Sequence, residues 1–240
     1  MGTFCTLSTG GESAFLLRMM FDFGFVKYSP TPITLKSGRE SHVYVFGRED
    51  ITDNPRLLYA LGDKVRDAAR LIFEKLTLVN DSRIPCLIGL PTAGTPLAQA
   101  ASMVSFFEKR YNMRGAANTS ERMCFRIMRE TRKKHGVHGG WVNGAPDTKK
   151  HFYCTVDNVV TDGATKVEMA NRLIEDGYPA YDMPQLILVA REDGIAEKLM
   201  ALGFKHVVIL YSLRDIIDGF QRIGVWTPEM AAAALQEFQN

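Results

Sequence analysis

Apolar and polar positions in this 240-residue chain form two alternating patterns. Short continuous apolar runs are typical of strands that are covered on both faces. They occur at about 84–90, 123–128, 153–160, 185–190 and 204–211. Between them, apolar residues recur at helical spacing, most clearly in 54–76, 97–107 and 166–174. This alternation predicts an α/β fold with a mainly parallel, twisted sheet and helices on both of its faces.

The first 46 residues follow a different pattern. Residues 1–11 are small and polar and predict a loose tail, whereas 12–25 have the spacing of a helix with one apolar face. Two prolines then force an extended segment, and the residues after it predict a pair of short strands. We therefore expect 1–46 to form a tail, a helix and a small hood over the strand ends, and 47–240 to form the core.

The stretch 152–165 carries the clearest candidate chemistry. It is a buried strand that breaks at a glycine-containing turn and continues into an amphipathic helix. Such a turn offers unpaired backbone N–H groups and the positive end of a helix to an anion, and Thr161 and Thr165 add hydroxyl groups. Asp157 and Asn158 stand at the carboxyl end of the strand, at a spacing that suits a ribose 5-phosphate. An ordinary strand-to-helix turn without a ligand fits this stretch alone equally well.

A second candidate is the segment 129–144, in which glycines and cationic side chains crowd together. This composition cannot build a core, so it predicts either a solvated surface loop or a mobile catalytic lid. Guanidinium and ammonium groups would neutralise negative charge that develops on an anionic leaving group. Glycine-rich flanks would allow a lid to close and exclude water.

Composition limits the classes of partner. Apolar residues make up 46% of the chain and charged residues 23%, and the net charge is +2, so we expect neither a nucleic acid nor a membrane as partner. The four cysteines are scattered and lack metal-ligand spacing, which indicates structural thiols in a reducing compartment. No apolar run is long enough to span a bilayer. These features together predict a cytoplasmic protein.

Four blocks, occurring in order, resemble the type I phosphoribosyltransferases and, among them, orotate phosphoribosyltransferase. They are 33–41 (ITLKSGRES), 89–98 (GLPTAGTPLA), 129–140 (RETRKKHGVHGG) and 152–165 (FYCTVDNVVTDGAT). The resemblance implies the type I phosphoribosyltransferase fold with an N-terminal hood. It also implies transfer of the phosphoribosyl group of phosphoribosyl diphosphate (PRPP) to orotate. In that family Mg²⁺ is bound mainly through PRPP, and the catalytic loop reaches the neighbouring subunit of a homodimer.

The resemblance assigns roles to individual residues. Those expected to contact the diphosphate are Lys36, Thr92, Gly94, Arg129, Lys133 and His135. Those expected at the 5-phosphate are Thr161, Asp162, Gly163, Ala164 and Thr165. Those expected at the ribose are Asp157 and Asn158, and those expected at the base are Tyr44, Val45, Phe46 and, for its carboxylate, Arg191. Lys133, His135 and Asp157 are the expected catalytic residues, and no side chain is assigned as a metal ligand.

The sequence also departs from the family pattern. Asn158 stands where a second acid is usual, Glu130 where a lysine is common, and Asp162 where a small residue is usual. Ala93 replaces a lysine that many members carry, although others share the Thr-Ala-Gly found here. Two alternatives therefore remain open: transfer to another base, or a non-catalytic protein of the same fold that binds PRPP or a nucleotide.

Overall fold

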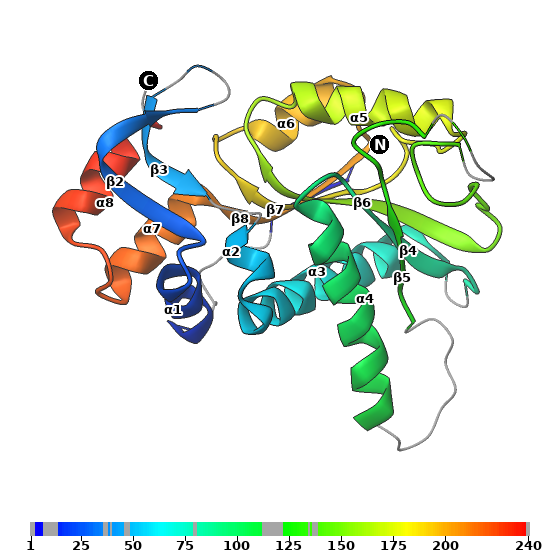
Figure 1. Ribbon diagram of the computed structural model, residues 1–240, viewed down its shortest axis with the longest axis horizontal. Helices are drawn as coiled ribbons and strands as arrows, with labels where there is room; N and C mark the ends of the chain where they lie inside the picture. Colours follow the sequence, from blue (N-terminus) through cyan, green and yellow to red (C-terminus); the bar gives the residue numbers. More distant parts are fainter. Residues whose placement is uncertain are drawn as a thin grey trace.

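The computed structural model describes residues 3–6, 14–35, 38, 40–45, 49–78, 81–111, 122–133, 135 and 139–238. Six strands, all paired in parallel, form one sheet in the order β1-β8-β7-β6-β4-β5 (Figure 1). They are β1 (Thr3–Thr6), β4 (Ile84–Gly89), β5 (Cys124–Ile127), β6 (His151–Val160), β7 (Gln185–Ala190) and β8 (His206–Ser212). Strands β4 to β8 coincide with the apolar runs, so the predicted parallel sheet is confirmed.

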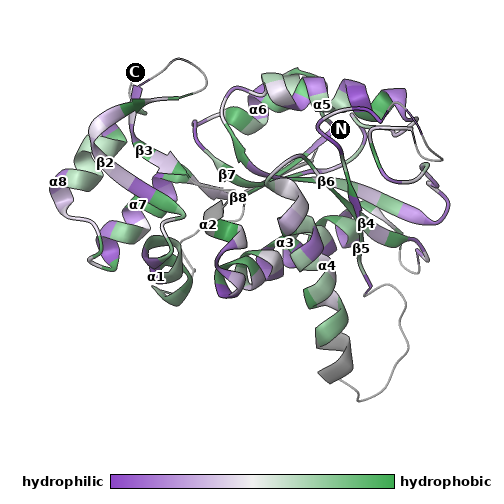
Figure 2. Cartoon of the chain, in the orientation of Figure 1, coloured by the Kyte–Doolittle hydropathy of each residue, from purple (hydrophilic) through white to green (hydrophobic). Residues whose placement is uncertain are grey.

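Helices cover both faces of the sheet (Figure 1). They are α3 (Pro55–Leu76) and α4 (Gly94–Tyr111) on one face, and α5 (Ala164–Glu175) and α6 (Ile195–Ala201) on the other. Side chains alternate along a strand, so Leu186 and Leu188 of β7 pack with α3 and α4, whereas Ile187 packs with α5 and α6. Figure 2 shows the central strands as largely hydrophobic and the helices as mixed. The predicted three-layer α/β arrangement is thus confirmed.

The N-terminus corrects one expectation. Residues Thr3–Thr6 form β1, which pairs in parallel with His206–Ile209 of β8 at the edge of the sheet. The prediction of a loose tail is therefore wrong for these four residues. Four residues (TFCT) are too few to establish a strand pattern of their own, and the strand exists because β8 offers an open edge for pairing.

The hood combines both ends of the chain. Its elements are α1 (Ala14–Asp22), β2 (Val26–Thr34), β3 (Glu40–Val45), α7 (Leu213–Arg222) and α8 (Pro228–Gln236), and the short α2 (Glu49–Thr52) leads back to the core. Strands β2 and β3 pair antiparallel, which confirms the predicted strand pair. Helix α7 packs on α1, and α8 packs on β3 (Figure 1). The sequence places all of 47–240 in the core, but the C-terminal helices α7 and α8 pack on α1 and β3 and complete the hood.

Local capping fixes the course of the C-terminal helices. The Ser212 hydroxyl accepts a hydrogen bond from the backbone N of Asp215 at 3.0 Å where α7 begins. The Thr227 hydroxyl accepts one from the backbone N of Met230 at 3.3 Å, and Pro228 follows as the first residue of α8. These caps define where α7 and α8 begin, and α8 packs on β3. Within the described part of the chain, no helix is long and apolar enough to cross a membrane.

Candidate active site

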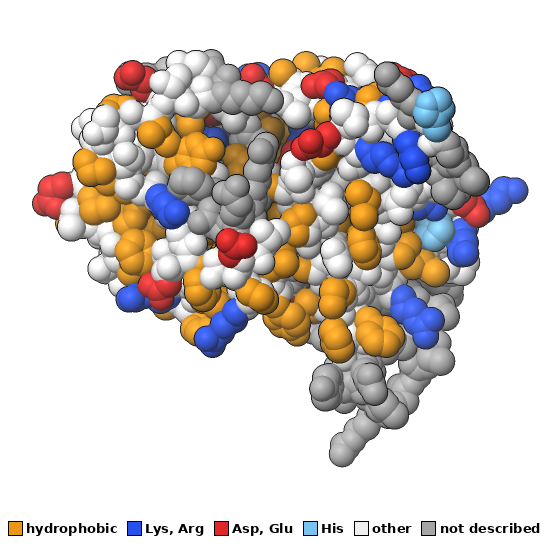
Figure 3. Space-filling view, in the orientation of Figure 1, with side chains coloured by type: hydrophobic (Ala, Val, Ile, Leu, Met, Phe, Trp, Pro, Cys, Tyr) orange, Lys and Arg blue, Asp and Glu red, His pale blue; other side chains and the backbone are white. Residues whose placement is uncertain are grey.

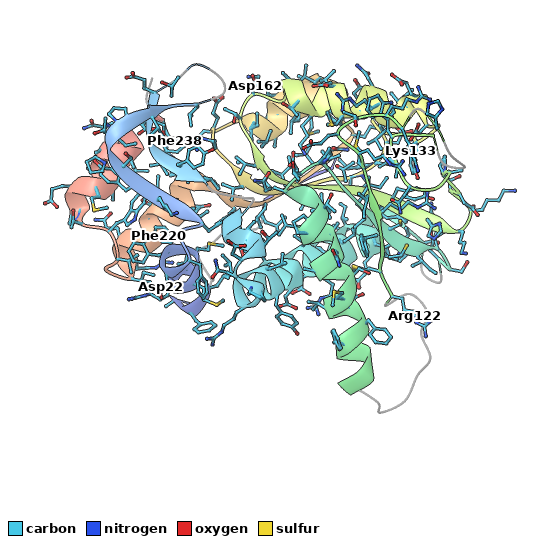
Figure 4. All side chains as sticks on the ribbon, viewed as in Figure 1. Asp22, Arg122, Lys133, Asp162, Phe220 and Phe238 are labelled. Atoms are coloured by element: carbon cyan, nitrogen blue, oxygen red, sulfur yellow. The ribbon has the colours of Figure 1, made fainter. Side chains whose placement is uncertain are left out.

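A cavity of about 240 Å³ lies between the hood and the carboxyl ends of β6 and β7. Its described lining includes Ser41, Thr161, Arg191, Glu237 and Phe238. Figure 4 labels Phe238 on the hood and Asp162 on the nearest loop of the core. The crevice beyond the carboxyl ends of parallel strands is where open α/β sheets bind ligands, so this cavity is the leading candidate site.

The turn between β6 and α5 has the expected cradle shape. Gly163 adopts φ +87°, a backbone conformation that favours glycine, and a Cβ there would also lie 2.9 Å from Cδ2 of Leu199, which would have to shift. The Asp162 side chain is exposed, and its Oδ1 accepts a hydrogen bond from the backbone N of Ala164 at 3.0 Å. One donor of the candidate phosphate cradle is therefore bonded to a carboxylate of the chain itself.

Asp157 has a partner that the sequence analysis missed. Its Oδ2 lies 2.7 Å from Nζ of Lys166, whose side chain is only 2% exposed, while that of Asp157 is 15% exposed. Its Oδ1 accepts a hydrogen bond from the backbone N of Asn158 at 2.9 Å. Burial lowers the pKa of Lys166, and the Asp157 charge opposes that shift. A signal was available, because Lys166 shares the buried face of α5 with Met169, Ala170 and Leu173.

The turn after β4 is shaped by close packing against β6. A Cβ on Gly94 would lie 2.1 Å from the backbone O of Val156, so the glycine is needed for contact between backbones. This finding gives Gly94 a packing role, and its expected contact with a diphosphate stays a prediction. Thr92 is exposed, and its hydroxyl donates to Oε1 of Glu130 at 2.6 Å. The loop that carries Glu130 therefore meets the candidate diphosphate turn.

The base of the 129–144 loop is docked on the core. Nη1 of Arg129 donates to the backbone O of Gly140 at 2.8 Å, so this arginine ties the two limbs of the loop together. Trp141 Nε1 donates to Glu175 of α5 at 2.9 Å. Lys133 and His135 are exposed, and Figure 4 shows Lys133 far from Phe238. None of the loop cations that the structure describes (Arg129, Arg132, Lys133 and His135) lines the hood cavity of this chain.

Arg191 is held at the junction of hood and core. Its Nη2 donates to the backbone O of Val43 at 2.8 Å and contacts the Ser41 hydroxyl at 3.0 Å. Tyr44 is half-buried, and Val45 is buried in the main core cluster, and neither belongs to the described cavity lining. The remaining predicted contacts, Lys36 and Phe46, lie outside the described residues.

The structure thus brings only part of the predicted site together. Thr161 and Arg191 line one cavity, and Ser41 and Glu237 line it with them. The Ser41 hydroxyl donates to Oε2 of Glu237 at 2.5 Å, and the backbone N of His42 donates to Oε1 at 2.6 Å. The sequence analysis missed Ser41 and Glu237 because a contact between residues 196 positions apart leaves no local pattern.

The charges at the site are mainly acidic. Four carboxylates line the described part of the cavity, with one guanidinium. They are Glu40, Glu192, Asp193 and Glu237, and the guanidinium is Arg191. At the ribose position, Asp157 is bonded to Lys166 and the neighbouring side chain is an amide, so these residues do not fit a divalent metal bound directly by the protein. The described residues also contain no group of three or more metal-ligating His, Cys, Asp or Glu side chains.

Comparison with known proteins identifies the fold. No family model matches the chain. The UMP synthase of Leishmania donovani is 19% identical with a TM-score of 0.70, over 96% of this chain and 43% of that protein. The orotate phosphoribosyltransferase of Mycobacterium tuberculosis, in complex with PRPP, is 20% identical with a TM-score of 0.51, over 85% and 97%. The adenine phosphoribosyltransferase of Trypanosoma brucei is 13% identical with a TM-score of 0.50, over 90% and 86%.

These similarities cover part of the UMP synthase and support conclusions about the fold. The chain spans less than half the length of the UMP synthase that it matches. At identities near 20%, structural similarity establishes the fold, whereas the chemistry has to be argued from the site. The expected type I phosphoribosyltransferase fold is therefore confirmed.

Proposed function

We propose that this chain, which has the fold of the type I phosphoribosyltransferases, transfers the phosphoribosyl group of PRPP to orotate. The products would be orotidine 5′-monophosphate and diphosphate, as in pyrimidine biosynthesis. The proposal depends most on one cavity, which is lined both by Thr161 of the anion-binding turn and by Arg191. A 5-phosphate in that turn and a carboxylated ring at the guanidinium are the ligands that suit these two groups. The PRPP complex of the M. tuberculosis enzyme supports the choice of co-substrate.

In this reaction the C1′–O bond to diphosphate breaks, the C1′–N1 bond to orotate forms, and the N1 proton is released. Positive charge grows on the ribose and negative charge on the leaving group. The protein therefore has to position the reactants, neutralise the diphosphate and exclude water. The backbone N–H groups of 163–165 and the Thr161 hydroxyl would hold the 5-phosphate, and Asp162 would have to leave the Ala164 N–H. Asp157 would accept hydrogen bonds from the ribose hydroxyls.

Lys133 and His135 would act in the site of a neighbouring subunit. Both are exposed, and Lys133 lies far from the hood cavity of its own chain (Figure 4). Exposed apolar side chains support a homodimer, because Met103, Phe106 and Phe107 of α4 are 50%, 54% and 40% exposed. Figure 3 shows hydrophobic side chains on the face of the molecule over α4. Phe106→Glu would then weaken association, as measured by sedimentation equilibrium. A monomeric wild-type protein would refute the shared site.

Mg²⁺ would enter the site with PRPP. The diphosphate and ribose oxygens are hard ligands that Mg²⁺ prefers, and it keeps several waters when bound in this way. Asn158 would contribute an amide oxygen to a ribose hydroxyl and no negative charge. The protein would therefore bind Mg²⁺ indirectly, by holding the PRPP oxygens that ligate the metal.

We propose that the protein acts in the cytoplasm. Its partners would be small molecules, and neither a nucleic acid nor a membrane. The net charge of +2 offers little attraction to polyanions. The described cysteines Cys86, Cys124 and Cys154 are free thiols, which suits a reducing compartment.

A second candidate is a protein that binds PRPP or a nucleotide without turnover. One specific observation favours it: three donor sites for ligand anions are already bonded to carboxylates of the chain. Those carboxylates are Asp162 in the phosphate turn, Glu130 at the diphosphate turn and Glu237 beside Arg191.

The acidic cavity lining would also suit transfer to an uncharged base, and the adenine phosphoribosyltransferase shows that the fold accommodates one.

The deciding experiment measures loss of orotate absorbance with Mg²⁺ and PRPP. We expect PRPP-dependent consumption that is lost in Lys133→Ala and retained in Lys149→Ala, a change at another exposed lysine. Calorimetric binding of PRPP without consumption of orotate would exclude orotate transfer, and a screen of other bases would then separate the two alternatives. Absence of both would refute the whole proposal.

A further inference from the structure

We propose that Glu237 determines which acceptor enters the site, because its carboxylate occupies the position that a carboxylate on the base would take. An acceptor with its own carboxylate must first displace Glu237, whereas an uncharged acceptor need not. The inference rests on the proposed function in one respect, namely that the hood cavity receives the base.

The side chain of Glu237 is bound as an anionic ligand would be. Oε2 accepts from the Ser41 hydroxyl at 2.5 Å, and Oε1 accepts from the backbone N of His42 at 2.6 Å. Both oxygens of one carboxylate are thus received by two adjacent residues of β3. Short hydrogen bonds to an ionised group are the stronger kind, so this is a specific contact.

The same position lies beside Arg191. The Ser41 hydroxyl that donates to Glu237 also lies 3.0 Å from Nη2 of Arg191, and Ser41 is only 2% exposed. One buried hydroxyl therefore separates the guanidinium from the Glu237 carboxylate. A carboxylated ring that approached Arg191 from the cavity would compete with Glu237 for the Ser41 hydroxyl and the His42 N–H.

Contacts of Glu237 and Phe238 hold the Glu237 carboxylate where this competition requires it. Glu237 directly follows α8, and its backbone N donates to Ala234 at 3.3 Å. The next residue, Phe238, stacks against Arg214, whose guanidinium carbon lies 5.0 Å from the ring centroid. Arg214 is in turn paired with Asp193 of the cavity lining at 2.6 Å. A carboxylate tethered in this way has a high effective concentration at its own subsite.

The test compares orotate with uracil, the same ring without the carboxylate, by calorimetry on the 240-residue chain. In Glu237→Gln, which keeps the shape and an acceptor oxygen, we expect orotate to bind about tenfold more tightly or better. Uracil affinity should stay within about twofold. The control Glu40→Gln removes the same charge from the same cavity without freeing Ser41 or His42, and should change orotate affinity by less than about threefold.

A second variant that ends at Gln236 removes the tethered carboxylate altogether. It should raise orotate affinity in the same way, provided that its melting temperature stays near that of the wild type. If that variant is unstable, Glu237→Gln alone decides. Unchanged or weaker orotate binding in Glu237→Gln would overturn the inference and leave Glu237 as a structural link between α8 and β3.

Separate measurements distinguish this result from failure of the proposed function. PRPP binding and orotate turnover are recorded for every variant. Gain of orotate affinity without turnover would support the competition by Glu237 and refute orotate transfer. Turnover with no gain in orotate affinity would support transfer and refute the role of Glu237.

Discussion

Replacing Lys166 with methionine removes an ammonium group while keeping an unbranched side chain of similar length in the core. In the folded protein this ammonium lies 2.7 Å from Oδ2 of Asp157, and the Lys166 side chain is 2% exposed. A charge so deeply buried is tolerated because it is paired. Methionine would leave the Asp157 carboxylate at the ribose position without its counter-charge.

We expect the free energy of unfolding to fall by about 3 kcal/mol. Breaking a buried ion pair by removing one partner costs roughly 3–5 kcal/mol. The lower end applies because Asp157 keeps 15% exposure and a hydrogen bond from the Asn158 backbone. For a chain of this length, about 3 kcal/mol corresponds to a melting temperature lower by about 6–12 °C.

The pair also predicts a pH dependence. Burial lowers the pKa of Lys166 from its ordinary value of 10.5, and the Asp157 charge opposes the shift. Between the folded-state pKa and 10.5, the unfolded chain binds more protons than the folded chain, so the stability contributed by this group rises with pH. That contribution is complete above 10.5 and is lost as the pH falls through the folded-state pKa. The stability difference between wild type and Lys166→Met should therefore grow with pH across this window.

The assay is urea unfolding of the wild type, Lys166→Met, Asp157→Asn and the double variant at matched pH. The two single changes should be strongly non-additive, with a coupling energy of about 2 kcal/mol or more. Lys198→Met, at an exposed position of α6, should change stability by less than about 0.5 kcal/mol. A Lys166→Met protein as stable as the wild type, or an additive double variant, would refute the reasoning.

Two further substitutions and one labelling experiment test the turns and the sheet. Gly94→Ala forces a Cβ to within 2.1 Å of the backbone O of Val156, so the free energy of unfolding should fall by about 3 kcal/mol or more. The urea midpoint measures this loss, and an unchanged midpoint would contradict the packing role. Asp162→Ala frees the backbone N–H of Ala164 at the start of α5, so ribose 5-phosphate should bind about tenfold more tightly, as measured by calorimetry. Equal affinity of variant and wild type would mean that Asp162 does not compete with the phosphate. A hydrogen bond from Cys86, aided by the guanidinium of Arg126, lowers the pKa of Cys124 to about 7. The rate of Cys124 labelling by iodoacetamide should therefore rise as the pH passes through 7. A midpoint of the labelling rate near pH 9 would refute the assignment.

Much of the fold could be predicted from local pattern. The runs that became β4 and β7 are continuous and apolar because both faces of these strands are covered. The helix α3 begins after Asn54 at Pro55, a residue that favours the first helical turn. By contrast, β1 carries no strand pattern, since it depends on pairing with β8.

The candidate site was predictable only where it is built from one continuous stretch. The cradle around Gly163 follows from a strand, a glycine and a helix in succession, and the structure has that form. The mutual arrangement of Arg191, Ser41 and Glu237 was not predictable, because it joins three distant segments. Lys166 was an intermediate case, since its place on an apolar helical face was visible but its partner was not.

The sequence by itself determined the order of strands and helices, the glycine turns at their junctions and the residue types offered to an anion. These features depend on interactions between neighbours in the chain, which a local pattern records. The tertiary structure alone decided how those groups are already engaged: Asp157 with a buried ammonium, and Glu237 with the hydroxyl beside Arg191. Such contacts arise when folding packs side chains that are not adjacent in sequence against one another, and polar groups removed from water must then find a partner.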